Sequence, residues 1–210
     1  PDKASPTHRK HRTPATMIGT LLIVSGPSGS GKTTLCRRAE AAGLTRYSIS
    51  CTTRAPRPGE RNDIDYHFLS RDDFDARVAA GDFLEHATVH GNSYGTLKAD
   101  IVELLLQGHN VVMDIDVQGA ASIRACTDPV IRRAYADVYI HVPAPELEAR
   151  LRGRGTDAED VIRLRLHNAA MEDARSGEYQ YLLTSGDREQ DYARFTALLT
   201  ALGMRTALQD

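Results

Sequence analysis

Short apolar runs alternate along this chain with longer segments in which apolar residues recur on one helical face. The apolar runs predict buried strands at Leu21–Val24, near Tyr47–Cys51, and at Val111–Ile115, Val138–Val142 and Tyr181–Thr184. The periodic segments predict helices over about residues 32–42, 70–81, 97–107, 145–151, 158–174 and 189–202. Because strands and helices alternate, with glycine-rich turns between them, we expect an α/β fold in which helices flank a parallel central sheet.

Residues 54–96 interrupt this alternation. Two strand-like pieces, Tyr66–Leu69 and Leu84–Val89, lie on either side of one helix, which begins with the capping pattern of Ser70 followed by Asp73. We therefore expect a small α+β subdomain, about residues 54–96, inserted into a core formed by residues 17–53 and 97–210.

Residues 1–16 have a different character from the rest of the chain. They contain three prolines, four basic residues against one acidic residue, and almost no apolar side chains. Such a segment buries too little apolar surface to offset the entropy of ordering, which predicts a flexible basic tail. A basic arm that binds an acidic partner is the alternative.

The composition excludes several classes of function. Hydrophobic residues make up 41% of the chain, but no apolar run approaches the roughly 18 residues of a membrane-spanning helix, so we expect no membrane partner. A net charge of −2 excludes the protein-wide basic field with which proteins bind nucleic acid without sequence preference. The three cysteines (Cys36, Cys51 and Cys126) lack C-x-x-C spacing, and the polar N-terminus lacks an apolar signal segment, which together predict a cytoplasmic protein.

The segment GPSGSGKT at residues 26–33 matches the phosphate-binding pattern G-x-x-x-x-G-K-[ST]. The glycines let successive backbone N–H groups face one anion, and the following helix points the positive end of its dipole at the same place. Lys32 adds a cation for the β- and γ-phosphates, and the Thr33 hydroxyl can join the shell of Mg²⁺. We expect a nucleoside triphosphate to contact Gly26, Pro27, Ser28, Gly29, Ser30, Gly31, Lys32, Thr33 and Thr34.

Two carboxylates, Asp114 and Asp116, follow an apolar run in the segment VVMDID. Proteins with a phosphate loop hold their metal ion with a carboxylate near a neighbouring strand end, which makes Asp114 a candidate magnesium ligand beside Thr33. Each carboxylate is also placed to cap the helix that follows. The residues alone leave both interpretations open.

The segment after the second predicted strand carries Arg54 and Arg57, three residues apart. Two guanidinium groups that converge on one phosphate make bidentate, charge-assisted hydrogen bonds, so this pair is a candidate phosphate clamp. Tyr66 and Tyr94, taken alone, are equally consistent with packing residues, and Glu85 with a solvated carboxylate.

A cluster of arginines surrounds two glycines between residues 150 and 166. The arginines are Arg150, Arg152, Arg154, Arg163 and Arg165, and the glycines are Gly153 and Gly155. Such a cluster is typical of a solvated helix face. Beside a phosphate loop, it is also consistent with a mobile lid that stabilises charge during phosphoryl transfer.

Seven motifs occur in one order over residues 19–200. They are GPSGSGKT (26–33), S-x-T-T-R-x-x-R-x-G-E (50–60), D-Y-x-F (65–68), F-L-E (83–85), G-N-x-Y-G-T (91–96), D-I-D-x-Q-G (114–119) and L-x-G-R-G-T (151–156). In this order the motifs resemble those of guanylate kinase, a nucleoside monophosphate kinase with a phosphate loop. The resemblance implies transfer of the γ-phosphoryl group of ATP to GMP with Mg²⁺, by in-line transfer under an arginine-rich lid.

The resemblance also implies roles for particular residues. Arg54, Arg57, Tyr66 and Tyr94 would hold the phosphate of GMP; Glu85 and Asp116 would accept hydrogen bonds from guanine, and Ser50 and Thr96 would supply hydroxyls. Adenine would leave the two carboxylates unpaired, because it lacks the donors that guanine presents. Thr33 and Asp114 would bind the metal, and Lys32, Arg54, Arg150, Arg154 and Arg165 would be catalytic.

Two positions depart from the family pattern. Asp63 stands where the family usually has glycine, and the segment after the last strand reads Thr184–Asp187 (TSGD) where the family tends to place an Asn-Asp pair near the donor adenine. Two rival functions stay open at this point: a kinase for another small phosphorylated acceptor, and a catalytically silent interaction module of the same fold. The sequence leaves monomer and homo-oligomer undetermined.

Overall fold

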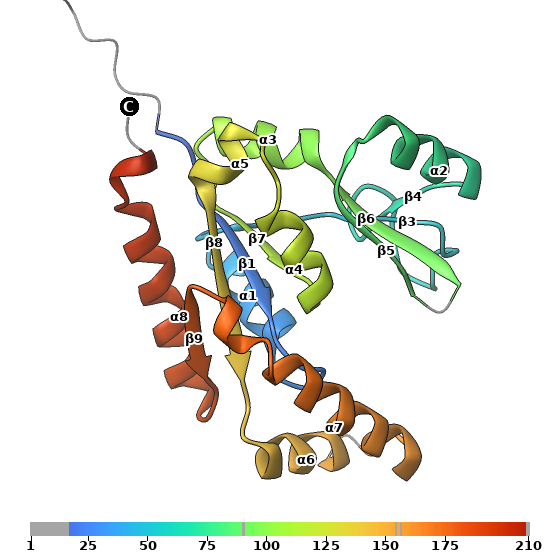
Figure 1. Ribbon diagram of the computed structural model, residues 1–210, viewed down its shortest axis with the longest axis vertical. Helices are drawn as coiled ribbons and strands as arrows, with labels where there is room; N and C mark the ends of the chain where they lie inside the picture. Colours follow the sequence, from blue (N-terminus) through green and yellow to red (C-terminus); the bar gives the residue numbers. More distant parts are fainter. Residues whose placement is uncertain (1–16, 90, 154, 156, 209–210) are drawn as a thin grey trace, which may run out of the picture.

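The computed structural model describes residues 17–208 except residues 90, 154 and 156 (Figure 1). Its centre is a five-stranded parallel sheet in the order β2-β7-β1-β8-β9. The strands are β1 (Leu21–Ser25), β2 (Arg46–Tyr47), β7 (Val111–Asp114), β8 (Tyr135–His141) and β9 (Tyr181–Thr184). This sheet, with helices on both sides, confirms the predicted α/β class.

Helices cover both faces of the sheet, which explains why its strands read as continuous apolar runs. On one face, Leu22 and Val24 of β1 pack with side chains of α1 (Lys32–Ala41) and α8 (Arg188–Gly203). On the other face, Leu21 and Ile23 pack with side chains of three helices. These are α3 (Lys98–Leu106), α4 (Val117–Arg124) and α5 (Pro129–Ala134).

A second sheet lies beside the first, at the right of Figure 1. It has the order β4-β3-β6-β5 and is formed by β3 (Cys51–Thr52), β4 (His67–Phe68), β5 (Phe83–Val89) and β6 (Asn92–Leu97). Helix α2 (Arg71–Ala80) joins β4 to β5, and Ser70 caps it as expected: the Ser70 hydroxyl accepts a hydrogen bond from the Asp73 N–H at 3.0 Å. This unit lies beside the carboxyl end of β7, where the sequence predicts the candidate site residues Asp114 and Asp116.

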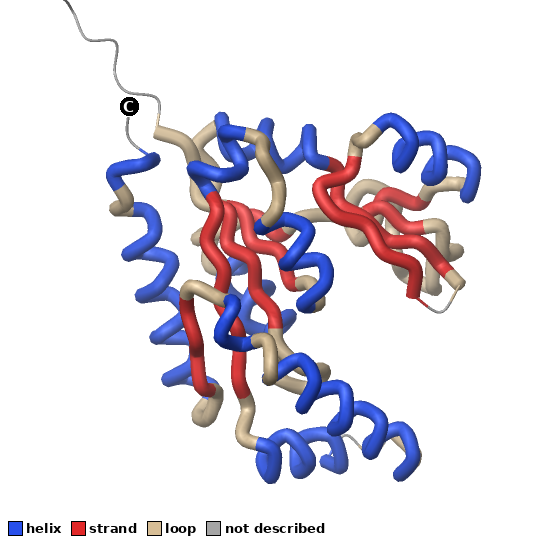
Figure 2. The backbone as a smooth tube through the Cα atoms, in the orientation of Figure 1, coloured by secondary structure: helices blue, strands red, loops and turns tan. Residues whose placement is uncertain are grey.

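Two helices form the lower end of the molecule and lie beyond the sheet (Figure 2). They are α6 (Ala144–Gly153) and α7 (Glu159–Asp173), which share a small apolar cluster with Leu147, Leu151 and Ile162 at its centre. Short 3₁₀ turns follow at Ser176–Glu178 and Thr206–Leu208. The chain between α6 and α7 carries Arg154, which lies outside the described residues.

The structure corrects one prediction of local structure and adds three elements. The strand expected near Tyr47–Cys51 is wrong, because two separate strands, β2 and β3, join different sheets there. Strand β6 was predicted only as a motif, α4 only as a helix that Asp114 or Asp116 could cap, and α5 was not predicted. Both helices are short, with eight and six residues, so an apolar periodicity is hard to detect in them. Asp116 caps the first helix and Asp128 caps the second.

The predicted tail of residues 1–16 lies outside the described residues. No helix in the described part of the chain is both long and apolar enough to cross a membrane.

A buried carboxylate ties β8 to the elements around it. Asp137 of β8 is fully buried and accepts hydrogen bonds from Arg124 Nη2 at 2.7 Å, from the Tyr135 hydroxyl and from the Gln180 N–H at 2.8 Å. The charge of Asp137 is therefore compensated by one guanidinium, from the end of α4. Burial without that partner would be unfavourable.

We expect Arg124→Ala to lower the free energy of unfolding by about 3 kcal/mol, because it leaves the Asp137 charge buried without its partner. Urea denaturation followed by circular dichroism measures this. Arg38→Ala is the matched control: Arg38 makes a bidentate pair with Glu189, at 2.8 and 2.6 Å, but both side chains are exposed. Its loss is expected to destabilise the protein much less, because water already screens the pair, and equal losses in the two variants would contradict the buried-charge argument.

Candidate functional site

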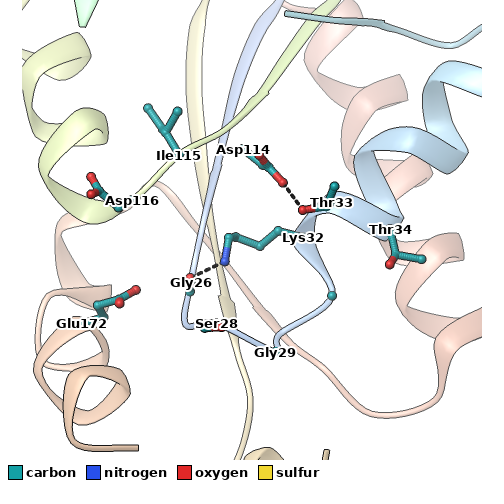
Figure 3. Close-up of a pocket in the computed structure, with 11 residues that line it drawn as sticks. Gly26, Ser28, Gly29, Lys32, Thr33, Thr34, Asp114, Ile115, Asp116 and Glu172 are labelled. Atoms are coloured by element: carbon teal, nitrogen blue, oxygen red, sulfur yellow. Dashed lines mark hydrogen bonds between the residues drawn. The ribbon is translucent and has the colours of Figure 1, made fainter. Parts of the chain in front are cut away.

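The predicted phosphate loop connects β1 to α1 at the carboxyl end of the central sheet (Figure 3). Gly26 has φ 144°, and a Cβ at this position would lie 2.4 Å from the Ile140 carbonyl oxygen of β8, so the loop requires glycine there. Gly31, at φ 91°, precedes the first turn of α1. The loop is thus held against the sheet at one end and leads into a helix N-terminus at the other.

The Lys32 ammonium folds back over its own loop. Lys32 Nζ donates to the carbonyl oxygens of Gly26 at 2.5 Å and Pro27 at 3.0 Å. Burial lowers the pKa of Lys32, and the negative charges of Asp114 and Glu172 oppose that shift. Among the described residues this half-buried ammonium is hydrogen-bonded by neutral carbonyl groups alone, so it is ready to exchange them for phosphate oxygens.

A cavity of about 480 Å³ opens beside this loop. Its lining combines the loop, the end of β7 and one residue of α7: Gly26, Ser28, Gly29, Gly31, Lys32, Thr33, Thr34, Asp114, Ile115, Asp116 and Glu172. We call it the phosphate pocket. Of the predicted triphosphate contacts, Pro27 and Ser30 are not in this lining, and Ser30 is buried.

The carboxylate of Asp114 lies between two hydroxyl groups. The parallel register places Asp114 of β7 opposite Val24 of β1, so the Thr33 hydroxyl at the start of α1 reaches it and donates to Oδ2. The Tyr47 hydroxyl donates to Oδ1 at 2.7 Å. Burial, together with the charge of Asp114, raises the pKa of Tyr47 well above its ordinary value, so this phenol stays a donor.

The Thr33–Asp114 pair fits Mg²⁺ as a donor set. Both residues offer the hard oxygen atoms that this ion prefers. Among the residues that the structure describes, no group of three or more His, Cys, Asp and Glu side chains is arranged to hold a metal. Mg²⁺ at such a site typically takes one or two protein ligands and completes its shell with substrate phosphates and water.

A second cavity of about 400 Å³ adjoins the first and extends under the small sheet. The two cavities share Thr33, Asp114, Ile115 and Asp116, so one wall separates them. The other lining residues of this acceptor pocket are Arg37, Tyr47, Ser48, Ser50, Glu60, Asp65, Tyr66, Glu85, Ala87, Val89 and Tyr94.

The floor of the acceptor pocket is polar and partly desolvated. Thr96 is buried behind the lining, where its hydroxyl donates to Glu85 Oε1 at 2.9 Å and lies 3.3 Å from the Ser50 hydroxyl. Burial raises the pKa of Glu85; the Thr96 hydrogen bond opposes the shift, and the nearby charge of Asp116 adds to it. The structure thus brings together Ser50, Glu85 and Thr96, which lie far apart in sequence.

Asp116 combines two roles that the sequence left as alternatives. It is the N-cap of α4, where Oδ1 accepts from the N–H groups of Gln118 at 3.0 Å and Gly119 at 2.8 Å. It also lines both cavities. The cap fixes the side chain through one oxygen, which leaves Oδ2 for a ligand in the acceptor pocket.

Arg54 is held at the edge of the acceptor pocket by a network of side chains. Its Nη2 donates to both carboxylate oxygens of Glu60 at 2.9 and 3.0 Å, and its guanidinium lies 5.5 Å from the centre of the Tyr66 ring. The rings of Tyr66 and Tyr94 meet edge to face, with centroids 6.2 Å apart. Arg57 was predicted to join this group, but its side chain is exposed and only its backbone N–H binds Glu60, at 2.7 Å.

The described lid arginines are bound to carboxylates near the phosphate loop. Arg150 Nη2 pairs with Glu146 at 2.5 Å and also donates to the Ser185 hydroxyl at 3.0 Å. Arg165 pairs with Asp157 at 3.2 Å and lies 3.4 Å from the Ser28 hydroxyl. Neither guanidinium lines the phosphate pocket in this conformation.

The segment after β9, where the sequence departs from the family pattern, is a turn held by hydrogen bonds to one side chain. The Ser185 hydroxyl donates to the buried carboxylate of Asp191 at 2.6 Å, and the Gly186 N–H donates to the same group. Ser185 thus links Asp191 to Arg150.

The departure at Asp63 leaves the loop in the conformation that glycine favours. Asp63 has φ 61°, and it is the only described residue other than glycine in the left-handed region. Its carboxylate lies 2.7 Å from His67 Nδ1 and accepts from the Asn62 amide at 2.9 Å. These contacts hold the side chain that glycine would lack.

Sequence reasoning missed several residues of the site, and four of them carry a charge or a phenol: Arg37, Tyr47, Glu60 and Glu172. Only Glu60 carried a local signal, because it follows Arg57 by three residues in the same motif. Tyr47 and Glu172 reach the site from distant elements, and no spacing in the sequence relates them to the phosphate loop.

The chain is similar to guanylate kinases in sequence and in structure. The model of the family described as Guanylate kinase matches residues 18–202. The guanylate kinase of Alkalilimnicola ehrlichii is 44% identical over 199 residues, which cover 92% of this chain and 94% of the relative. That of Syntrophotalea carbinolica is 43% identical over 194 residues, covering 90% and 89%. The crystal structure of guanylate kinase from Anaplasma phagocytophilum has a TM-score of 0.70 at 29% identity, covering 93% of this chain and 92% of that one.

We expect Glu60→Gln to weaken GMP binding about tenfold, because it removes the carboxylate that holds Arg54 beside Tyr66. Calorimetric titration of GMP measures this. Glu103→Gln on α3 removes an equal charge from an exposed position outside both cavities and serves as the control. Unchanged GMP affinity in the Glu60 variant would show that Arg54 is positioned without it.

Proposed function

The chain belongs to the guanylate kinase family, and from this membership we propose that it transfers the γ-phosphoryl group of ATP to GMP, giving ADP and GDP. The observation that carries the proposal is the shared wall of Thr33, Asp114, Ile115 and Asp116. A phosphate pocket and a pocket with guanine-type partners meet at this wall, which is what direct transfer between two nucleotides requires. The relatives do not favour the two rival functions, a kinase for another acceptor and a silent module.

We assign the phosphate pocket to ATP. The backbone N–H groups of residues 28–34 and the ammonium of Lys32 would hold its phosphates. Thr33 and Asp114 would hold Mg²⁺, which would supply positive charge to neutralise the transferred group. The Tyr47 hydroxyl donates to the Asp114 carboxylate and so fixes the orientation of this metal ligand.

We assign the acceptor pocket to GMP. Glu85 and Asp116 Oδ2 would accept hydrogen bonds from the ring N–H and amino group of guanine, while Ser50 and Thr96 supply hydroxyls. Adenine presents an acceptor where guanine presents a donor, so it would leave a partly desolvated carboxylate unpaired at a large cost in affinity. Arg54, Tyr66 and Tyr94 would bind the phosphate of GMP and hold its attacking oxygen in line. Arg57, whose exposed side chain lies outside the pocket lining here, would join them by turning inward.

The transfer itself needs no covalent intermediate. Its transition state spreads negative charge over the transferred group, and catalysis consists of positioning and charge stabilisation. Arg150, Arg154 and Arg165 would supply positive charge as the lid closes, each contributing about 10³-fold to the rate by analogy with arginine fingers. For Arg150 and Arg165, closure means exchanging Glu146 and Asp157 for phosphate. Closure also excludes the water that would otherwise hydrolyse ATP.

We also propose that the protein works in the cytoplasm. Cys36, Cys51 and Cys126 are all unpaired, as expected in a reducing compartment.

The function is tested by ADP release with ATP, Mg²⁺ and, separately, GMP, AMP, CMP and UMP. We expect turnover with GMP alone, and Glu85→Ala is expected to lower kcat/KM for GMP by about 10²-fold or more. His86→Ala, on the opposite side of β5, is the control. Turnover of the parent protein with another nucleotide, or undiminished GMP preference in the Glu85 variant, would contradict the acceptor assignment.

Lys32→Ala is expected to abolish measurable turnover, because it removes the only lysine in the phosphate pocket lining. The same assay measures this at saturating GMP. Lys98→Ala, a lysine at the start of α3 that lines neither cavity, is expected to keep full activity. Activity retained by the Lys32 variant would remove the phosphate loop from the mechanism.

A further inference from the structure

Glu172 is a carboxylate that the proposed mechanism does not use. It projects from the last turn of α7 into the lining of the phosphate pocket, opposite the loop (Figure 3). Its side chain is half-buried, and among the residues that the structure describes none forms a hydrogen bond or an ion pair with it. Partial burial of an unpaired carboxylate beside a site for anions costs free energy. Its presence in this lining therefore calls for an explanation.

Anchoring of α7 does not account for Glu172. That role falls to the next residue, Asp173, whose Oδ1 accepts from the Tyr139 hydroxyl at 2.7 Å and lies 3.3 Å from His141 Nδ1. These two contacts tie the end of α7 to β8. Glu172 faces the other way, toward Lys32 and Asp116, whose charges affect its pKa; burial raises that pKa and the ammonium of Lys32 opposes the shift.

The charges that line the phosphate pocket are negative in sum. Three carboxylates, those of Asp114, Asp116 and Glu172, face one ammonium, that of Lys32. Asp114 and Asp116 are committed to hydroxyl groups and to the cap of α4. Glu172 differs from them, because none of the described residues donates a hydrogen bond to its carboxylate. Its field therefore acts directly on whatever occupies the pocket.

We propose that Glu172 is a specificity-determining residue of the phosphate pocket: it repels a bare triphosphate and so selects the triphosphate that carries a divalent cation. The proposal rests on the assignment of this pocket to ATP. A divalent cation cancels two of the negative charges of the triphosphate, so the repulsion by Glu172 is largely relieved when the metal is bound. The backbone N–H groups and Lys32 attract both forms, and Thr33 and Asp114, as metal ligands, favour the complex directly. Glu172 adds to that preference by repelling the bare form.

The test compares binding of a non-hydrolysable ATP analogue in excess Mg²⁺ and in EDTA, by isothermal titration calorimetry. Glu172→Gln keeps the size of the side chain and removes its charge. We expect it to tighten binding about tenfold in EDTA and by less than about threefold in Mg²⁺, so that the preference for the metal complex shrinks. Thermal melting checks that the variant is folded.

Asp160→Asn is the matched control, because it removes one negative charge from an exposed position at the other end of the same helix. It is expected to leave the ratio of the two affinities unchanged. An unchanged ratio in Glu172→Gln, or equal tightening with and without Mg²⁺, would overturn the proposal. If the parent protein binds the analogue in neither condition, the assignment of the pocket to ATP fails, and this inference fails with it.

Discussion

The site depends on the parallel pairing of β1 with β7, in which Val24 lies opposite Asp114. Parallel strands end at the same edge of a sheet, so the loop that leaves β1 and the carboxylate that ends β7 emerge side by side. The first turn of α1 then brings Thr33 to Asp114, and β2, paired on the far side of β7, brings Tyr47 to the same group. Both cavities are built on this one edge, which is why they share a wall.

The parts of the site that sequence predicted are those specified locally. The phosphate loop is read from eight consecutive residues, because each glycine meets a requirement of its own backbone: Gly26, Gly29 and Gly31 have φ angles of 144°, 94° and 91°. Ser70 was predicted as a cap for the same reason: its partner, Asp73, is three residues away. Asp114 was predicted because a strand end is visible as the end of an apolar run.

The parts that sequence missed depend on contacts between distant elements. Residues near Tyr47–Cys51 form two short strands, because the chain leaves the central sheet there and enters the small one; an apolar pattern does not record that change. Arg57 shares a motif with Arg54, yet Glu60 binds the side chain of one and the backbone of the other. The three-residue spacing of Arg54 and Arg57 predicted a pair of phosphate-binding side chains. It could not show that Glu60 binds the side chain of Arg54 but the backbone of Arg57.

Asp63 determines which sequences this loop can accept. A left-handed backbone conformation is open to glycine, asparagine and aspartate at little cost and is closed to β-branched residues. Here the aspartate also binds His67, whose other ring nitrogen lies 3.7 Å from Asp100 at the start of α3. The two positions are therefore coupled: a change at 63 removes one of the two acidic partners of His67 and weakens the link that this histidine makes between the acceptor loop and α3.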